Sequence, residues 1–165
     1  MEDLSRFAEP APRGLTLDEL QVGMTAEIER TVTEEQVRQF AEASSDWNPV
    51  HMDETYARTT AFRGRIAHGL LPASFVSAVV GTRLPGPGSL YLGQTLSFSK
   101  PTRIGDVVTA RVTVRSIDPA TARVTLHTVA LVNGEVALEG EALVRVPRRA
   151  PRASRASQAS PASQA

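Results

Sequence analysis

The sequence contains no cysteine, few aromatic residues and no long apolar run. Without cysteine, the 165-residue chain forms no disulfide framework, thiolate metal site or thiol nucleophile, and we expect it in the reducing cytoplasm. No apolar run approaches the roughly 18 residues of a membrane-spanning helix, and the first residues lack the basic-then-apolar pattern of a secretory signal. The 18 basic side chains balance 18 acidic ones, which argues against a dedicated nucleic-acid surface.

The composition predicts one folded domain with a tail at each end. Residues 147–165 hold four arginines and no acid, and are otherwise built from Ala, Ser, Pro and Gln. Such residues bury too little apolar surface to offset the entropy of ordering, so we expect a disordered tail, with an RNA- or phosphate-binding arm as the alternative. Residues 1–14 are expected to be flexible as well. The folded domain is therefore predicted over residues 15–146.

The first half of this domain predicts a strand, a helix and a long loop. The strand is expected over residues 24–31. Thr33 and Gln36 have the spacing of a capping box, in which each side chain satisfies a free amide of the first helical turn. The following loop, residues 45–65, is expected to contain one helical turn near residues 54–59. Loops of this length inside a domain are usually functional.

The second half predicts an apolar helix followed by strands. Residues 66–80 are apolar on more than one face, which predicts a helix buried almost all round. Asn133-Gly134 is a strong signal for a two-residue hairpin turn. Alternating or β-branched residues predict strands over residues 91–98, 106–117, 122–132 and 135–146. This order predicts an α+β fold in which an antiparallel sheet wraps around the apolar helix.

The segment Asp46-Trp47-Asn48-Pro49-Val50-His51 places an acid, an amide and an imidazole together before the apolar helix. Pro49 restricts the backbone and stiffens the segment, and a general acid/base pair needs such fixed positions. Histidine titrates near neutral pH, and a nearby carboxylate can fix its tautomer or share a bound water. Two other interpretations remain open. In the first, Asp46 and Asn48 only form a turn, and His51 has a structural role. In the second, Asp46, His51 and Asp53 bind a metal.

The dipeptide His68-Gly69 stands at the expected start of the apolar helix. Free amides of a first helical turn attract developing negative charge, and glycine lets a substrate carbonyl approach the backbone closely. The position therefore suits an oxyanion hole for a thioester enolate, or a glycine needed only for tight helix packing. We expect structural roles for His68 itself and for His127.

Three segments of the chain carry a family resemblance: SSDWNPVHMDETYARTTAFRGRIAHGLL, LPGPGSLYLGQTLSFSKP and GDVVTARVTV. They resemble the MaoC-like family of (R)-specific enoyl-CoA hydratases, including those that supply monomers for polyhydroxyalkanoate synthesis. The most specific part is the D-x-N-P-hydrophobic-H element with A-H-G downstream. The resemblance implies a hot-dog fold, in which a curved antiparallel sheet wraps a long central helix, and a homodimer.

The resemblance also implies a role for individual residues. Asp46 and His51 match the catalytic dyad, and Gly69 matches the backbone donor to the thioester carbonyl. The supporting residues are Asn48 and His68, and the acyl-pocket residues are Ser77 and Val80, three apart on one helical face.

The implied activity is the reversible hydration of trans-2-enoyl-CoA to (R)-3-hydroxyacyl-CoA, a hydro-lyase reaction that uses the dyad and an activated water. We expect no metal and no redox cofactor, with coenzyme A as the substrate carrier. The expected partners are an acyl-CoA thioester and a second copy of the chain, without nucleic acid or membrane. Two alternatives stay open: a 3-hydroxyacyl-[acyl-carrier-protein] dehydratase of fatty-acid synthesis, and a non-catalytic acyl-thioester-binding protein. A hot-dog thioesterase is a lesser option.

Overall fold

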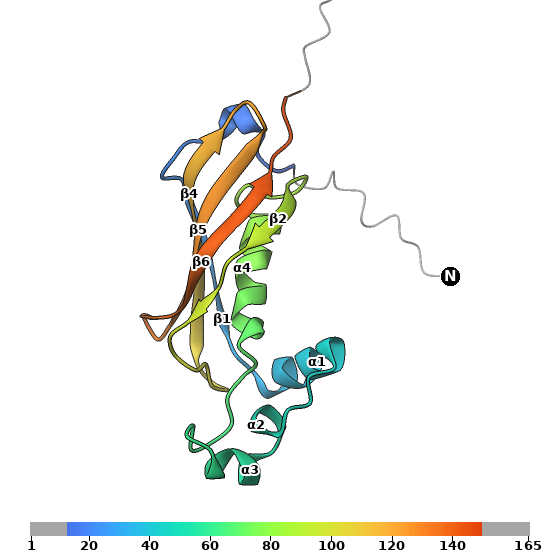
Figure 1. Ribbon diagram of the computed structural model, residues 1–165, viewed down its shortest axis with the longest axis vertical. Helices are drawn as coiled ribbons and strands as arrows, with labels where there is room; N and C mark the ends of the chain where they lie inside the picture. The colour runs from blue at the N-terminus through green and yellow to red at the C-terminus, as the bar shows by residue number, and fades with distance from the viewer. Residues whose placement is uncertain (1–12, 150–165) are drawn as a thin grey trace, which may run out of the picture.

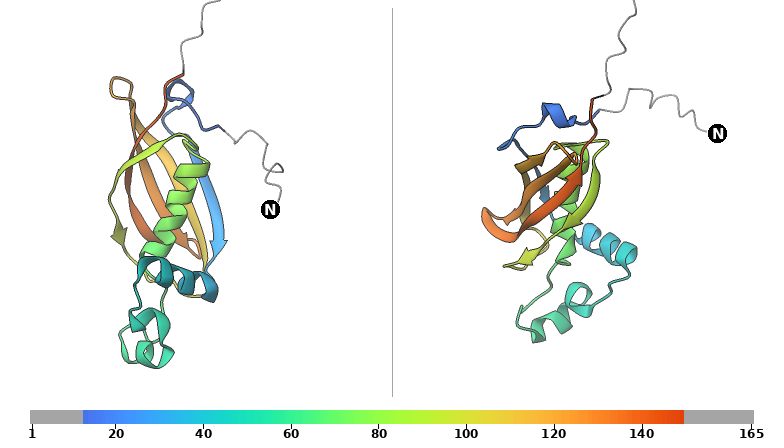
Figure 2. Two further views of the ribbon diagram at one scale, coloured as in Figure 1. Left: turned by 90° about the vertical axis from the view of Figure 1, so that its right-hand side faces the viewer. Right: turned by 45° about the horizontal axis from the view of Figure 1, so that its top comes forward.

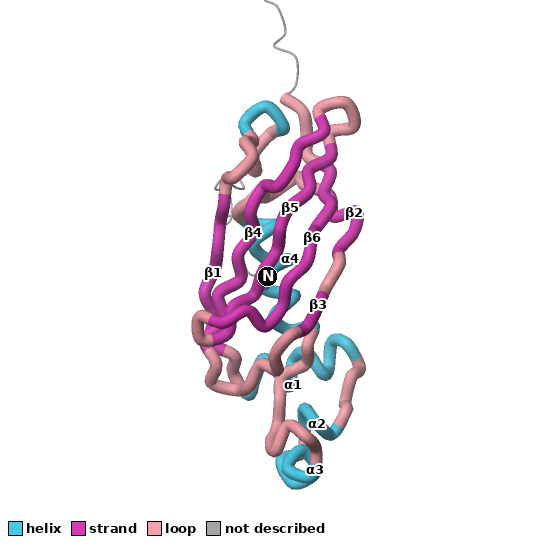
Figure 3. Tube along the Cα trace, turned by 60° about the vertical axis from the view of Figure 1, so that its left-hand side comes forward, coloured by secondary structure: helices cyan, strands magenta, loops and turns pink. Residues whose placement is uncertain are grey.

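Three long strands with alternating buried side chains form the centre of one antiparallel sheet. The computed structural model describes residues 13–149. The strands are β1 (Thr25–Thr31), β2 (Leu90–Gln94), β3 (Ser97–Phe98), β4 (Val107–Asp118), β5 (Arg123–Val132) and β6 (Glu135–Arg145). They pair in the order β1-β4-β5-β6-β2, with β3 also on β6, as Figure 3 shows. The single strand expected over residues 91–98 is therefore two shorter strands, β2 and β3.

The apolar helix α4 (Leu70–Thr82) packs against one face of this sheet, next to β1, β4 and β5 (Figure 1). Its inner side is buried through Phe75, Val76 and Val79. The prediction of burial almost all round was wrong, because the sheet covers only one side of the helix. Among residues 13–149, no strand lies on the outer side of α4 (Figure 2, left), and Leu70 there is 54% exposed.

The helix also begins later than residue 66, where the sequence predicted its start. The amide of Ile66 donates to the carbonyl of Val50 at 3.3 Å. The amide of Ala67 donates to the carbonyl of Thr102 at 2.7 Å. These bonds tie residues 66–67 to the neighbouring segments, and the helical hydrogen bonds of α4 begin only after Gly69.

Three helices lie together below the sheet, at the end where α4 begins (Figure 1). They are α1 (Glu34–Ser44), α2 (Pro49–Met52) and α3 (Glu54–Thr59). The predicted capping box at the start of α1 is confirmed, since Thr33 Oγ1 accepts from the amide of Gln36 at 3.1 Å. The turn expected near residues 54–59 is α3, whereas α2 was not predicted. Pro49 at its first turn and the Asn48 side chain as its cap account for α2.

The predicted hairpin between β5 and β6 is confirmed at Asn133-Gly134, where both residues have positive φ angles of 51° and 86°. One residue of β6 differs from the expected alternation. Val136, two positions before the buried Leu138, is exposed, and Ala137 is buried instead. The register shifts between Ala130 and Leu131 of β5, and such a bulge turns the following side chain to the other face.

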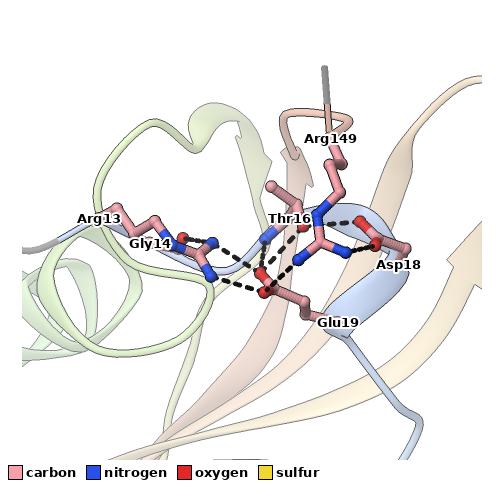
Figure 4. Close-up of polar contacts among 6 residues, drawn as sticks. All are labelled: Arg13, Gly14, Thr16, Asp18, Glu19 and Arg149. Atoms are coloured by element: carbon pink, nitrogen blue, oxygen red, sulfur yellow. Dashed lines mark hydrogen bonds and ion pairs between the residues drawn. The ribbon is translucent and has the colours of Figure 1, made fainter. Parts of the chain in front are cut away.

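The described ends of the chain meet at the other end of the sheet. Arg13 forms a bidentate ion pair with Glu19 at 2.8 and 2.7 Å, and Arg149 lies 3.6 Å from Asp18 (Figure 4). The Arg13 hydrogen bond holds the pKa of Glu19 well below its usual range. The tails predicted for residues 1–14 and 147–165 lie mostly outside the described residues. Within residues 13–149, no helix is long and apolar enough to cross a membrane.

Candidate active site

Side-chain-to-backbone hydrogen bonds hold the segment that carries Asp46. Ser45 ends α1 in the left-handed conformation, with a φ of 61°. The amide of Asp46 donates to Ser44 Oγ at 3.2 Å, and the amide of Asn48 donates to Asp46 Oδ1 at 3.2 Å. The side chain of Asn48 then accepts from the amide of Val50 at 3.1 Å and so caps α2. The carboxylate of Asp46 is therefore oriented by its own loop while its side chain stays exposed.

His51 lies in α2 and is only 8% exposed. Its Nδ1 lies 2.9 Å from the carbonyl oxygen of Ile66. Because a carbonyl only accepts, Nδ1 carries a proton, and Nε2 of the neutral ring keeps a free lone pair. Burial lowers the pKa of His51 from its usual value of 6.5, so the neutral form is favoured at pH 7. The Arg65 side chain donates to the carbonyl of His51 at 2.6 Å and pairs with Glu34.

His68 lies two residues before α4, next to its N-cap Gly69, and is 2% exposed. Its Nε2 donates to the main-chain carbonyl of Asp46 at 2.8 Å. The His68 ring packs on the His51 ring, with centroids 4.0 Å apart and planes tilted by 35°. The Phe40 ring also packs on the His68 ring, with their centroids 5.0 Å apart. Among residues 13–149, no partner is present for its buried Nδ1. His68 thus contacts both members of the predicted dyad.

The fold brings the side chains of Asp46, His51 and His68 together from the loop after α1, from α2 and from the segment before α4. One nitrogen or carboxylate oxygen of each lies within 4.8 Å of the others. The alternative cluster of Asp46, His51 and Asp53 does not form in this way. Asp53 instead caps α3, where its carboxylate accepts from the amide of Tyr56 at 3.0 Å.

Two neighbouring pockets meet at Gly69. A pocket of about 520 Å³ is lined by Phe40, Ser44, Asp46, His68, Gly69, Leu70 and Phe98. A second, mainly apolar pocket of about 290 Å³ shares Gly69 and Phe98 and extends to Lys100. A Cβ atom on Gly69 would lie 3.2 Å from Cε1 of Phe98, so a side chain here would crowd the ring. The missing side chain therefore leaves the backbone of Gly69 open to both pockets.

The remaining predicted residues lie elsewhere. Ser77 is exposed on the outer side of α4, whereas Val80 is buried in the core, and neither lines these two pockets. His127 lies on β5, where its Nε2 is 2.8 Å from Glu139 Oε1. Phe98 was missed at the site by the sequence reasoning. An aromatic residue in a strand-like run carries no signal that it will border a pocket.

This chain matches the MaoC like domain over residues 18–135. It is 50% identical to an (R)-specific enoyl-CoA hydratase of Rhodospirillum rubrum over 132 residues. The matched region covers 80% of this chain and 92% of that protein. It is 46% identical over 140 residues to a 3-hydroxybutyryl-CoA dehydratase of Methylorubrum extorquens, which covers 85% of this chain and 89% of that protein. An unliganded R-hydratase of Pseudomonas aeruginosa has a TM-score of 0.78 and 40% identity, and the match covers 82% of this chain and 88% of that one.

The chain therefore belongs to the MaoC-like family, and the predicted α+β hot-dog fold is confirmed. Within this family it is a hydro-lyase, an enzyme that adds water to a double bond or removes it.

Proposed function

We propose that this chain catalyses the reversible hydration of trans-2-enoyl-CoA to (R)-3-hydroxyacyl-CoA. The observation that carries the proposal is the placement of the Asp46 carboxylate and the His51 imidazole in one cluster, whose atoms lie within 4.8 Å of one another. Relatives named as (R)-specific enoyl-CoA hydratase and 3-hydroxybutyryl-CoA dehydratase, at 50% and 46% identity, support this substrate class.

In the proposed reaction, a water molecule between Asp46 and His51 adds to C3 of the enoyl group. The free Nε2 of His51 accepts a proton from this water, because its Nδ1 already donates to Ile66. Asp46 orients the water, and the proton that His51 has accepted passes through the Asp46 carboxylate to C2, so both side chains return to their starting protonation states. Negative charge develops on the thioester oxygen, where the amide of Gly69 and the N-terminal end of α4 stabilise it. The thioester itself polarises the double bond, so the chemistry requires no redox cofactor, and coenzyme A serves as the carrier.

Asn48 and His68 support the dyad in this proposal. The backbone amide of Asn48 donates to the Asp46 carboxylate and orients it, and His68 Nε2 donates to the main-chain carbonyl of Asp46. Both contacts act on the residue that orients the water, and misplacement of a reacting group by about 1 Å costs about 100-fold in rate.

We further propose that the chain forms a homodimer through β2 and the outer side of α4. The strand β2 is at one end of the sheet order and exposes Leu90 and Leu92, and Leu70 is exposed on α4. Exposed apolar side chains on an edge strand favour association with another chain. A second copy on this face would cover the exposed Ser77 and could enclose it in an acyl pocket, whereas Val80 is buried in the core and would act on that pocket only from behind. Light scattering should give the mass of two chains, and Leu90→Glu should give that of one.

Substitution of the dyad tests the reaction. Asp46→Asn and His51→Ala should each reduce hydration of crotonyl-CoA, followed as loss of enoyl ultraviolet absorbance, by about 10²–10⁴-fold. His127→Ala is the matched control, because His127 pairs with Glu139 outside the cluster, and it should keep the wild-type rate. Near-wild-type rates in both dyad variants would show that the assignment is wrong.

Rates on the two carriers, a free-thiol assay and a binding measurement together separate the rival functions. Faster turnover of the thioester on acyl carrier protein than on coenzyme A would favour the fatty-acid-synthesis dehydratase. Release of free thiol would indicate a thioesterase, and binding without turnover would indicate an acyl-thioester sensor.

A further inference from the structure

We infer that Asp46, His51 and His68 form a binding site for a borderline transition-metal cation, of which Zn²⁺ is the type, and that the bound cation inhibits the enzyme. Metal binding follows from the donor set alone. Inhibition rests additionally on the proposed function, because the cation would occupy groups assigned to the reaction.

The first argument is the hydrogen bonding of the two imidazoles. His51 Nδ1 donates to the carbonyl of Ile66 at 2.9 Å, and His68 Nε2 donates to the carbonyl of Asp46 at 2.8 Å. A histidine that binds a metal almost always donates its other ring N–H to a carbonyl or carboxylate, which fixes the ring and its tautomer. Both rings therefore already have the outer contacts of metal ligands.

The second argument is the buried Nδ1 of His68. His68 is 2% exposed, and within residues 13–149 this nitrogen has no hydrogen-bond partner. A buried polar atom without a partner is uncommon in folded proteins, because it loses its hydration without compensation. A cation beside it would use the lone pair that the protein leaves free.

The third argument is the spacing of the donors. One donor atom of each side chain lies within 4.8 Å of the others. In a tetrahedral zinc site with bonds of about 2.1 Å, donor atoms lie about 3.4 Å apart. The widest gap between the measured atoms exceeds this spacing by about 1.4 Å, so the site must contract when a cation binds. The exposed side chain of Asp46 can make part of that movement, and the two stacked rings, with centroids 4.0 Å apart, must turn so that their free nitrogens face one point.

The donor chemistry selects the kind of cation. Two imidazoles and one carboxylate suit Zn²⁺, Co²⁺ or Ni²⁺, whereas Mg²⁺ and Ca²⁺ prefer oxygen ligands alone. The nearby positive charge of Arg65 is paired with Glu34 at 2.9 Å, which reduces its repulsion of a cation. Three protein donors also leave a fourth position open for water.

Occupation of this site would block hydration. Coordination of His51 Nε2 removes the lone pair that accepts the proton, and coordination of Asp46 removes the carboxylate that orients the water. Free transition metal would thus act as a reversible inhibitor of a reaction that does not itself need metal.

Metal-stripped full-length protein tests the inference with two readouts. Co²⁺ titration should produce a visible absorption band that saturates at one equivalent and is displaced by Zn²⁺. Zn²⁺ should also inhibit crotonyl-CoA hydration, and a chelator should restore the rate. His68→Phe keeps an aromatic ring in the packed position, and Asp46→Asn changes an exposed residue. Both should weaken Zn²⁺ affinity, measured by calorimetry, by at least about 10–100-fold.

His127→Ala provides the matched control, because it removes the histidine of an exposed His–Glu pair and should leave Zn²⁺ affinity unchanged. Absence of the Co²⁺ band in the wild-type protein would overturn the inference, as would equal Zn²⁺ affinity in folded His68→Phe and Asp46→Asn proteins. Metal binding by a protein without hydratase activity would overturn the proposed function and the inhibition, but not the site. Active enzyme that does not bind Co²⁺ or Zn²⁺ would refute the site alone.

Discussion

The substitution Gly69→Ala should separate the loss of catalysis from any loss of stability. Gly69 has φ −58° and ψ −32°, a right-handed helical conformation that alanine adopts without strain. Replacing glycine at such a position restricts the unfolded chain and stabilises the fold by about 0.4–1 kcal/mol. The backbone conformation therefore gives no reason for the variant to unfold.

The new methyl group would, however, crowd Phe98. Its position would be 3.2 Å from Cε1 and 3.4 Å from Cδ1 of that ring, which is tighter than an ordinary contact. Overpacking a closed core costs about 1–3 kcal/mol. Phe98 is 53% exposed, so its ring can tilt toward solvent and the cost should fall at the low end of that range. The gain from restricting the unfolded chain offsets much of this crowding cost. The net change in the free energy of unfolding should therefore be within about 1 kcal/mol.

The effect on catalysis should be much larger. The methyl group would fill the space through which a thioester oxygen reaches the Gly69 amide. Losing one oxyanion donor costs about 10²–10³-fold in rate, and a carbonyl misplaced by about 1 Å costs about 100-fold. We therefore expect kcat/KM for crotonyl-CoA to fall by at least about 100-fold.

Initial rates and urea unfolding measured on the same preparation test both statements. The double variant Gly69→Ala/Phe98→Leu identifies the cause, because it relieves the crowding but keeps the methyl group. Recovery of activity in the double variant would show that displacement of Phe98, not obstruction of the amide, caused the loss. Wild-type kcat/KM in the single variant would refute the placement of the thioester at Gly69.

Three further predictions concern the base, a helix cap and a sheet glycine. Burial lowers the pKa of His51 below its usual 6.5, and the base must be unprotonated to accept a proton. The kcat/KM of metal-free enzyme should therefore fall only below pH 6.5. A midpoint above pH 6.5 in the pH–rate profile would contradict the role of His51 as the base. Thr33→Ala removes the cap of α1 and should reduce the free energy of unfolding by about 1 kcal/mol in urea, with little effect on the rate. Gly140→Ala would place a Cβ atom against the backbone oxygen of Thr95, so it should destabilise the protein by about 3 kcal/mol or more, and an unchanged melting temperature would count against that packing.

Local signals in the sequence predicted much of the fold. The capping box at Thr33 and the Asn133-Gly134 turn depend on hydrogen bonds and φ angles within four residues. Both can therefore be predicted from the local sequence without the rest of the chain. Strands β4, β5 and β6 were predicted from alternation, because one face of a sheet is buried. The sequence also identified Asp46, His51 and Gly69 as candidate site residues through their motif.

Only the tertiary structure decided how these residues meet. The bond from His68 to the Asp46 carbonyl joins residues 22 positions apart. That Nδ1 of His68 has no partner within the described part of the chain, residues 13–149, can be seen only when its surroundings are known. The exposed side of α4 and the outward turn of Val136 likewise depend on where the sheet ends and on a register shift in β5. A residue's own chemistry and near neighbours set its local conformation. Its burial and long-range partners depend on how distant segments pack, because that packing determines which polar atoms lose water and which contacts replace it.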